Sequence, residues 1–452
     1  MTNEIFKSGT VMLVPFRFNA NDIESINRAR KQLIDIIPNS SSKNNSSNVF
    51  NSLHYPDFIS FHLGNGFLNN GKDPYLKFYE LDKNRIKALT SRLHFLDKED
   101  ENNKIYFQIS KVQLILNQNK FLNEIALGYW MFEFEWEELD ASILLDKLAK
   151  TDFFRFHYFA VDKNKQIKNK NQIIYNEKGD TFYLNCWLRE FFSEFEFSQM
   201  NFYQPKPTLL HLINTQLGQK TENQFAFQAY CSLRVPPKNW LDGSIVPQNE
   251  MLNLKRISIA TEIVSLDEGT LVLQKFINAR TDVVNTYFPA FLMAVNQREV
   301  IHYLIQKTTT VFAENQSIDN DKLMDLRRLE SLKSMLITAK HFQIFHTISK
   351  NSEINKFFKE MQTTFLIDEG IKDVQDSINE MNELFADEDR KQKEERENRM
   401  NLVLGLIAFL GIFSALTDIF ELFDLAGKLT PHVVWIAIVL VLVFMFRPTK
   451  SK

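Results

Sequence analysis

The chain has 452 residues, with 53 basic and 56 acidic side chains and a formal net charge of -3. This length excludes a disulfide-stapled miniprotein and predicts two or three domains. The near-neutral balance provides no global basic field, so no direct nucleic-acid binding is expected. Two cysteines, Cys186 and Cys231, are too few for a zinc ribbon or an iron–sulfur cluster and indicate a reducing compartment for most of the chain.

Residues 1–250 are predicted to form a mixed α/β domain. Runs of alternating or aromatic residues predict strands at Thr10–Phe18, Ile105–Leu116, Gly128–Trp136 and Phe153–Phe159. Between the last two runs, Asp140 is a candidate N-cap for a helix over residues 140–150. A strand–helix–strand pattern is therefore expected there.

Two polar stretches indicate connections rather than packed elements. Pro38–Asn48 is a low-complexity run that is expected to be a flexible loop. Pro236–Asn249 contains proline, glycine and asparagine and is a candidate domain boundary. Residues 251–352 are predicted to be a helical region in which strand-like runs fade by about Gln274, with Pro289 near a helix start or a kink.

The next segment predicts a long stalk helix over residues 353–399, which continues to about Phe423. Apolar residues recur at steps of three and four, as in a coiled coil, with a wider gap at Asp368 and Gly370 where a kink would fall. These residues are Ile354, Phe358, Met361, Phe365, Ile371, Val374, Ile378, Met381 and Phe385. The charged run that follows, up to Asn398, is compatible with a solvated stalk or with a regulatory cation or lipid-headgroup site.

Two uncharged segments of 18 residues predict a transmembrane hairpin over residues 400–446. They are Met400–Thr417 and Leu429–Phe446. At 1.5 Å per residue each covers about 27 Å, which is close to the hydrocarbon thickness of a bilayer. The alternative is a buried helical hairpin. The N-terminus lacks a basic segment leading into an apolar one, so no signal peptide is expected.

Basic residues predict the orientation of this hairpin. Eight of them flank it on the outside of the two segments, and only Lys428 lies in the connecting loop. Both termini, including the basic tail 447–452, are therefore expected to be cytoplasmic in a multi-pass protein of the plasma (inner) membrane.

Small and polar residues fall on one face of the first segment, at steps of three and four. Such a face either packs closely against another helix or lines a pore. The candidate pore-lining residues are Asn401, Gly405, Ala408, Gly411, Ala415 and Asp418. Three carboxylates, Asp418, Glu421 and Asp424, would form an acidic outer mouth in a symmetric oligomer, or are solvated loop residues.

This order of elements resembles the CorA family of divalent-cation transporters. The local likeness is confined to Glu397–Leu416 (ENRMNLVLGLIAFLGIFSAL), which is similar to the stalk-to-membrane junction of that family. The resemblance implies a homopentamer, in which the first span lines the pore and the second packs outside it. The family's Gly-Met-Asn signature is absent, because the corresponding stretch reads Leu416–Asp424 (LTDIFELFD).

Divergent CorA-like proteins without this signature also resemble the membrane effectors of type III CRISPR antiviral defence. That resemblance implies a nucleotide-type second messenger as the ligand that gates the pore. Two alternatives stay open: a constitutive divalent-cation (Mg²⁺-type) transporter, and a membrane-anchored scaffold that does not conduct. No catalytic motif is found, so no enzyme activity and no required cofactor are expected, and no residue is assigned as a nucleotide or metal ligand.

Overall fold

The computed structural model describes residues 8–19, 33–36, 76–81, 86, 94–97, 104–117, 125–136, 139, 141–158, 180–183, 207–214, 255–267, 269–274, 280–315, 322–342, 344–422 and 436. The chain divides into two compact units, Met1–Ile378 and Asn379–Lys452, which we call the N-terminal unit and the C-terminal unit. Helix α11 (Ile367–Leu422) begins in the first unit and continues in the second.

The N-terminal unit contains one mixed β-sheet. Its strands lie in the order β10 (Lys255–Arg256), β11 (Thr261–Leu266), β12 (Gly269–Gln274), β9 (Thr208–Asn214), β1 (Gly9–Asn19), β6 (Ile125–Trp136), β5 (Lys104–Asn117), β4 (His94–Asp97), β7 (Thr151–Tyr158) and β8 (Asp180–Tyr183). The β9–β12 pair is parallel, whereas the other pairs among the described strands are antiparallel.

The sheet forks at β5, which is long enough to hold two partners on one edge. Residues 104–106 of β5 pair with β4, and residues 113–117 pair with β3 (Leu76–Leu81), which in turn pairs with β2 (Leu33–Ile36). The opposite edge of β5 pairs with β6 over residues 107–116. The three central strands β5, β6 and β1 therefore organise the sheet.

The core of the sheet is buried on both faces. Consecutive residues of β1, from Val11 to Arg17, are all buried, as expected for a strand that is covered on both sides rather than on one. Phe16 pairs directly with Gly128 of β6. A Cβ atom at Gly128 would lie 2.2 Å from the Phe16 ring, so this ring occupies the space that the missing side chain leaves.

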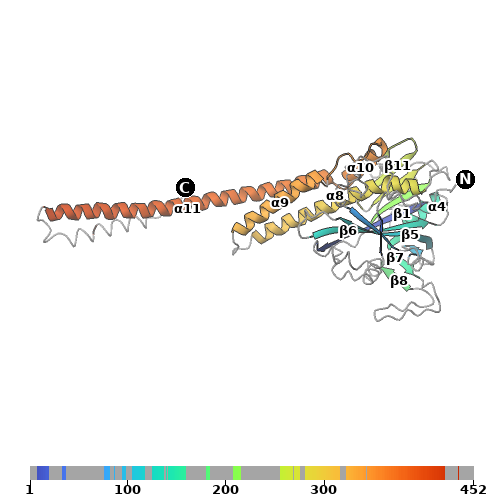
Figure 1. Ribbon diagram of the computed structural model, residues 1–452, viewed down its shortest axis with the longest axis horizontal. Coiled ribbons are helices and arrows are strands. Elements are labelled where there is room, and N and C mark those ends of the chain that lie inside the picture. Colours follow the sequence, from blue (N-terminus) through green and yellow to red (C-terminus); the bar gives the residue numbers. More distant parts are fainter. Residues whose placement is uncertain are drawn as a thin grey trace, which may run out of the picture. The chain divides into compact units, whose positions relative to one another are not determined.

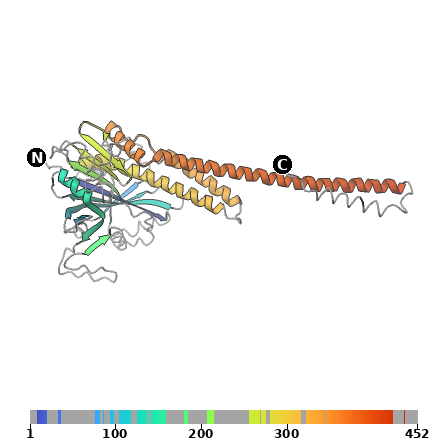
Figure 2. The same cartoon turned by 180° about the vertical axis from the view of Figure 1, so that it is seen from behind.

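Helices α8 to α11 follow β12 along the described part of the chain. Helix α8 (Arg280–Asn315) packs against β9 and lies beside α9 (Lys322–Phe342) in both views (Figures 1 and 2). Helix α10 (Ser352–Thr364) packs against α8 and β11, and α11 comes next. A further helix, α4 (Ala141–Lys150), connects β6 and β7.

The α+β class of the first unit is confirmed. The four predicted strands correspond to β1, β5, β6 and β7, and the predicted helix after Asp140 is α4. The range 251–352 differs from the helical region that we expected, because β10, β11 and β12 fall inside it and belong to the same sheet. Pro289 lies within α8 rather than at its start. The predicted loop 38–48 and boundary 236–249 lie outside the described residues.

The prediction of one uninterrupted helix from residue 353 to residue 423 is wrong. The chain forms α10, two turn residues, Phe365 and Leu366, and then α11. The apolar stripe is nevertheless buried as far as Met381, apart from the partly exposed Ile371. Its residues up to Ile378 belong to the N-terminal unit.

The membrane hairpin stays a prediction. Within the part of the chain that the structure describes, no helix is both long enough and apolar enough to cross a membrane. The segment 429–446 lies outside the described residues except for Ile436, and so does the basic tail 447–452.

Candidate functional site

A run of four polar residues, Asn296–Glu299, lies in the middle of α8 directly after its apolar segment Tyr287–Val295. The exposed fractions of Asn296, Gln297 and Glu299 are 2%, 0% and 1%. Buried polar side chains must find hydrogen-bond partners inside the protein, because burying them unpaired is costly. This run is therefore the place where α8 is joined to its surroundings by specific polar contacts.

Asn296 links α8 to the central strands of the sheet. Its Oδ1 atom accepts a hydrogen bond of 2.9 Å from the hydroxyl of Tyr129 on β6 and one of 3.0 Å from the amide of Asn117 on β5. All three side chains are buried. The contact fixes the position of α8 along the sheet.

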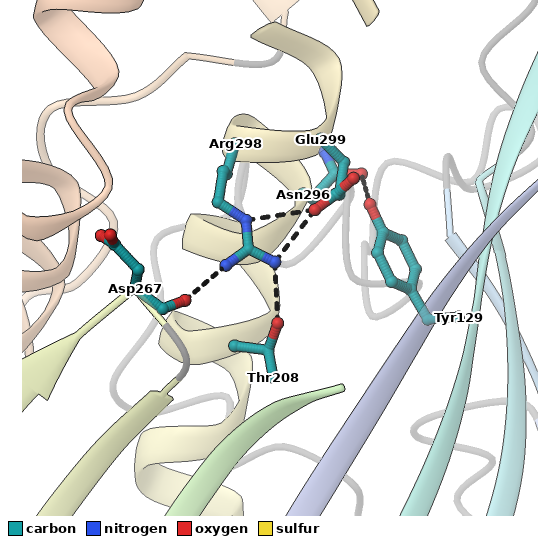
Figure 3. A network of polar contacts seen from close by, with 6 residues as sticks. All are labelled: Tyr129, Thr208, Asp267, Asn296, Arg298 and Glu299. Atoms are coloured by element: carbon teal, nitrogen blue, oxygen red, sulfur yellow. Dashed lines mark hydrogen bonds and ion pairs between the residues drawn. The ribbon is translucent and has the colours of Figure 1, made fainter. Parts of the chain in front are cut away.

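Arg298 links α8 to β9 and to the β11–β12 turn (Figure 3). Its guanidinium donates to the backbone carbonyl of Asp267, in the β11–β12 turn, at 2.9 Å and to the hydroxyl of Thr208, the first residue of β9, at 2.7 Å. The same group donates to Glu299 Oε1 through Nη2 at 2.9 Å and through Nε at 3.1 Å. One side chain thus joins two strands and balances a buried carboxylate.

Arg298 and Glu299 form a buried ion pair, in which each charge depends on the other for compensation. The Glu299 side chain is only 2% exposed and that of Arg298 only 11%. Removing one partner of a buried ion pair leaves the other charge uncompensated, which typically costs about 3–5 kcal/mol. Substitutions at Arg298 must therefore keep a positive charge if the fold is to be preserved.

Helix α10 is attached to the same polar run at its C-terminal end. The Gln362 amide donates to Gln297 Oε1 at 2.9 Å and to the carbonyl of Phe345 at 2.7 Å. Three residues further on, the Phe365 ring lies under the Arg298 guanidinium, 4.8 Å from the ring centre, in a cation–π contact. Arg298 thus contacts the sheet on one side and the end of α10 on the other.

The N-terminal end of α10 is also held by α8. The hydroxyl of Tyr287 donates a hydrogen bond to Glu353, in the first turn of α10, and its ring packs edge-on against Phe357 at 5.1 Å. Burial and the neighbouring carboxylate raise the pKa of Tyr287 well above its usual value, so the hydroxyl stays protonated and remains a donor. Asn351 caps the helix by accepting from the Glu353 amide at 2.8 Å.

Between α10 and α11, Leu366 adopts a left-handed backbone conformation with φ of 52°. The Leu366 amide donates to Thr363 at 3.2 Å, and its carbonyl accepts from the Gly370 amide at 2.9 Å, the first bond of α11. Glycine is the usual residue for such a position because an L side chain is strained there by about 1–2 kcal/mol. The Leu366 side chain is 58% exposed, so its own packing does not compensate this strain.

Gly370 allows α11 to approach α8 closely. A Cβ atom at this position would lie 2.6 Å from Cγ2 of Ile301. Ile301 lies two residues beyond the polar run of α8. The polar run and Ile301 therefore contact the end of α10 and the first turn of α11.

His302 lies in the next turn of α8. Burial lowers the pKa of its imidazole below the ordinary value of 6.5, and the positive charges of Arg298 and Arg17 act in the same direction. The carboxylates of Glu299 and Asp267 oppose this shift but are outweighed. His302 is therefore neutral at physiological pH.

The residues predicted to line a pore lie on α11 in the C-terminal unit, far along the chain from this polar cluster. Asn401, Gly405, Ala408, Gly411 and Ala415 are exposed, and nothing lies within 4 Å of a Cβ built on either glycine. The side chains of Asp418 and Glu421 are not described, and Asp424 lies outside the described residues. Pore lining and the acidic mouth stay predictions.

The sequence alone does not reveal the polar cluster of α8. The signal was visible as an apolar segment interrupted by Asn296–Glu299, yet the partners of Arg298 lie 31 and 90 residues away, which no local pattern reveals. Within the described ranges, no group of three or more His, Cys, Asp or Glu side chains could hold a metal ion.

No protein-family model matches this sequence, and the searches of curated proteins and of solved structures found no significant similarity.

Proposed function

We propose that this chain is an oligomeric, CorA-like membrane pore whose N-terminal unit gates it in response to a small nucleotide-type ligand, as an antiviral defence effector would. The observation that carries the proposal is the helix α11. It starts against the polar cluster of α8 and continues as one helix to Leu422.

The second half of α11 supports a membrane or oligomeric environment. Large apolar side chains on every side of the helix between Met400 and Ile412 are exposed, with fractions of 37–63%. A helix of a globular protein buries one apolar stripe, whereas a helix that is apolar all round requires lipid or other helices around it. The uncharged segment 429–446 supplies the second helix of the proposed hairpin.

The charged part of α11, from Asp387 to Arg399, supports a water-exposed connection between the two environments. Its described side chains are exposed except for the partly buried Gln392. Acidic residues precede basic ones by four positions at Asp387–Lys391, Asp389–Lys393 and Glu395–Arg399, a spacing that stabilises an isolated helix. Such a segment can stay helical without a protein partner, and can therefore transmit a movement.

In the proposed oligomer, which the family resemblance makes a pentamer, Asn401, Gly405, Ala408, Gly411, Ala415 and Asp418 line the pore. Asp418, Glu421 and Asp424 form rings at the outer mouth that attract cations. Both termini face the cytoplasm. The absent Gly-Met-Asn signature favours a gated pore over a selective Mg²⁺ transporter.

Ion flux from proteoliposomes tests this function. We expect cation efflux that depends on a small-molecule extract of virus-infected cells and is absent with an extract of uninfected cells. Steady Mg²⁺-selective flux without any extract would replace the proposal by constitutive transport. No flux with either extract, from protein shown to be inserted, would replace it by a non-conducting scaffold.

A further inference from the structure

The break between α10 and α11 is not what the local sequence favours. No proline occurs between Ser352 and Leu422, and the apolar spacing continues through the break. The left-handed residue is Leu366, although a glycine occurs four positions later at Gly370, already inside α11. Helices that end by local preference usually place the glycine at the left-handed position.

Tertiary contacts therefore impose the break. Phe365, the residue before it, is held under the guanidinium of Arg298, and Gln362 is held by Gln297 and the carbonyl of Phe345. At its other end, α10 is held by the contact between Tyr287 and Glu353. Residues that tertiary contacts hold against their local preference cluster at functional sites, switch regions among them.

We propose that the α10–α11 junction is a conformational switch, in which Arg298 holds Phe365 in place and its release allows residues 352–422 to form one continuous helix. The switch rests on the proposed function, since it is the step by which the N-terminal unit would act on the pore helix. Arg298 is a positioning residue in this account, because it also contacts Asp267 and Thr208 in the sheet and so senses a displacement of these strands.

The switch has two discrete states rather than a continuous range. Leu366 is either left-handed, as it is here, or right-handed within a helix, because the region between these backbone conformations is sterically forbidden. The exposed Leu366 side chain can move without leaving a cavity. Glycine at this position would favour the broken state by roughly tenfold or more, since it removes the left-handed strain and weakens a continuous helix.

Distance measurements between two spin labels test the switch in the full-length protein in detergent. Labels are placed at the exposed positions Lys359 on α10 and Asp376 on α11, after replacement of Cys186 and Cys231 by serine. In a continuous helix the 17 intervening steps would place the two Cα atoms about 25 Å apart. We expect a shorter distance in the broken state, because the turn at Phe365 and Leu366 changes the direction of the chain.

Four variants separate release from strain. Arg298→Lys keeps a charge beside Glu299 but loses the planar group that contacts Phe365, Asp267 and Thr208 together. We expect Arg298→Lys to add a population near 25 Å, Arg298→Lys with Leu366→Ala to retain it, and Arg298→Lys with Leu366→Gly to reduce it at least tenfold. Leu366→Ala alone, which loses the side chain but keeps the strain, should resemble the parent protein.

The result that would overturn the switch is the same single short distance in all variants, with thermal unfolding showing that each is folded. If Arg298→Lys unfolds the protein, the label distance is measured in the parent chain with and without infected-cell extract. A distance that the extract does not change would then also overturn the switch. Flux that responds to extract without any distance change would overturn the switch and leave the gated pore standing. A distance change in protein that never conducts would overturn the gated pore and leave the switch standing.

Discussion

The guanidinium of Arg298 lies 4.8 Å from the centre of the Phe365 ring, and this contact joins the sheet to the point where α10 ends. Arg298 approaches from α8 and is itself held by Thr208 and by the Asp267 carbonyl. Phe365 is followed at once by the left-handed Leu366. Arg298 therefore connects β9 and the β11–β12 turn to the end of α10 through one side chain.

The close approach of α8 and α11 predicts the effect of Gly370→Ala. The new methyl group would meet Ile301 Cγ2, a branch of a buried side chain that cannot rotate away, so we expect a loss of about 1–3 kcal/mol in the free energy of unfolding. Denaturant unfolding measures it. Ile301→Ala removes the clashing methyl group, so Gly370→Ala should cost less in that background. Equal costs in both backgrounds would contradict this packing.

The burial of His302 predicts a pH dependence of stability. The unfolded imidazole takes up a proton near pH 6.5 and the folded one only at lower pH, so the free energy of unfolding should fall as the pH drops below about 6.5. His302→Gln cannot take up this proton and serves as the control. The difference in stability between the two proteins should change between pH 7 and pH 5. A difference that is constant over this range would show that the folded imidazole titrates normally.

The open space at Gly411 predicts a substitution that reports on assembly alone. Because nothing in the described part of the chain lies within 4 Å of a Cβ at this position, we expect Gly411→Leu to be accommodated without disturbing the described residues of the same chain. In an oligomer packed through the small-residue face we expect a smaller assembly, measured by mass in mild detergent. Leu410→Phe adds bulk beside this face, at a residue that is 63% exposed, and should leave the mass unchanged. A monomeric parent protein would refute assembly through this face.

The distribution of basic residues predicts the topology of the hairpin. With Cys186 and Cys231 replaced by serine, a cysteine at position 421 should react with an impermeant thiol reagent in intact cells, and one at position 452 only after the cells are opened. Permeabilised cells give the reference for both positions. Labelling of residue 452 but not of residue 421 would reverse the orientation.

The sequence predicted the sheet better than the junction. The long runs of β1, β5 and β6 carry enough aromatic and β-branched residues to be recognised locally, and their pairing follows once their buried faces must meet. The break at Leu366 could not be predicted, since leucine favours a helix and the contacts that oppose it come from α8. The only local sign was the wider gap in the apolar spacing, which fell within four residues of the break.

The sequence indicates strand-like runs as far as about Gln274, but it does not place β10, β11 and β12 in the same sheet, for a related reason. They are short, and β12 joins the sheet through a parallel pairing with β9, which lies more than 50 residues earlier in the chain. Parallel pairing of distant segments leaves no turn signal between the two strands. A boundary near residue 250 therefore looked plausible, although residues on both sides of it belong to one sheet.

The central claim is that the state of the N-terminal unit controls a pore formed by α11, and flux from proteoliposomes containing Leu366 and Arg298 variants tests it most directly. With equal amounts of inserted protein and no extract, we predict that Arg298→Lys changes cation flux relative to the parent protein, that Leu366→Gly in the Arg298→Lys background reverses this change, and that Leu366→Ala in the same background does not. Identical flux from all four proteins would contradict the claim.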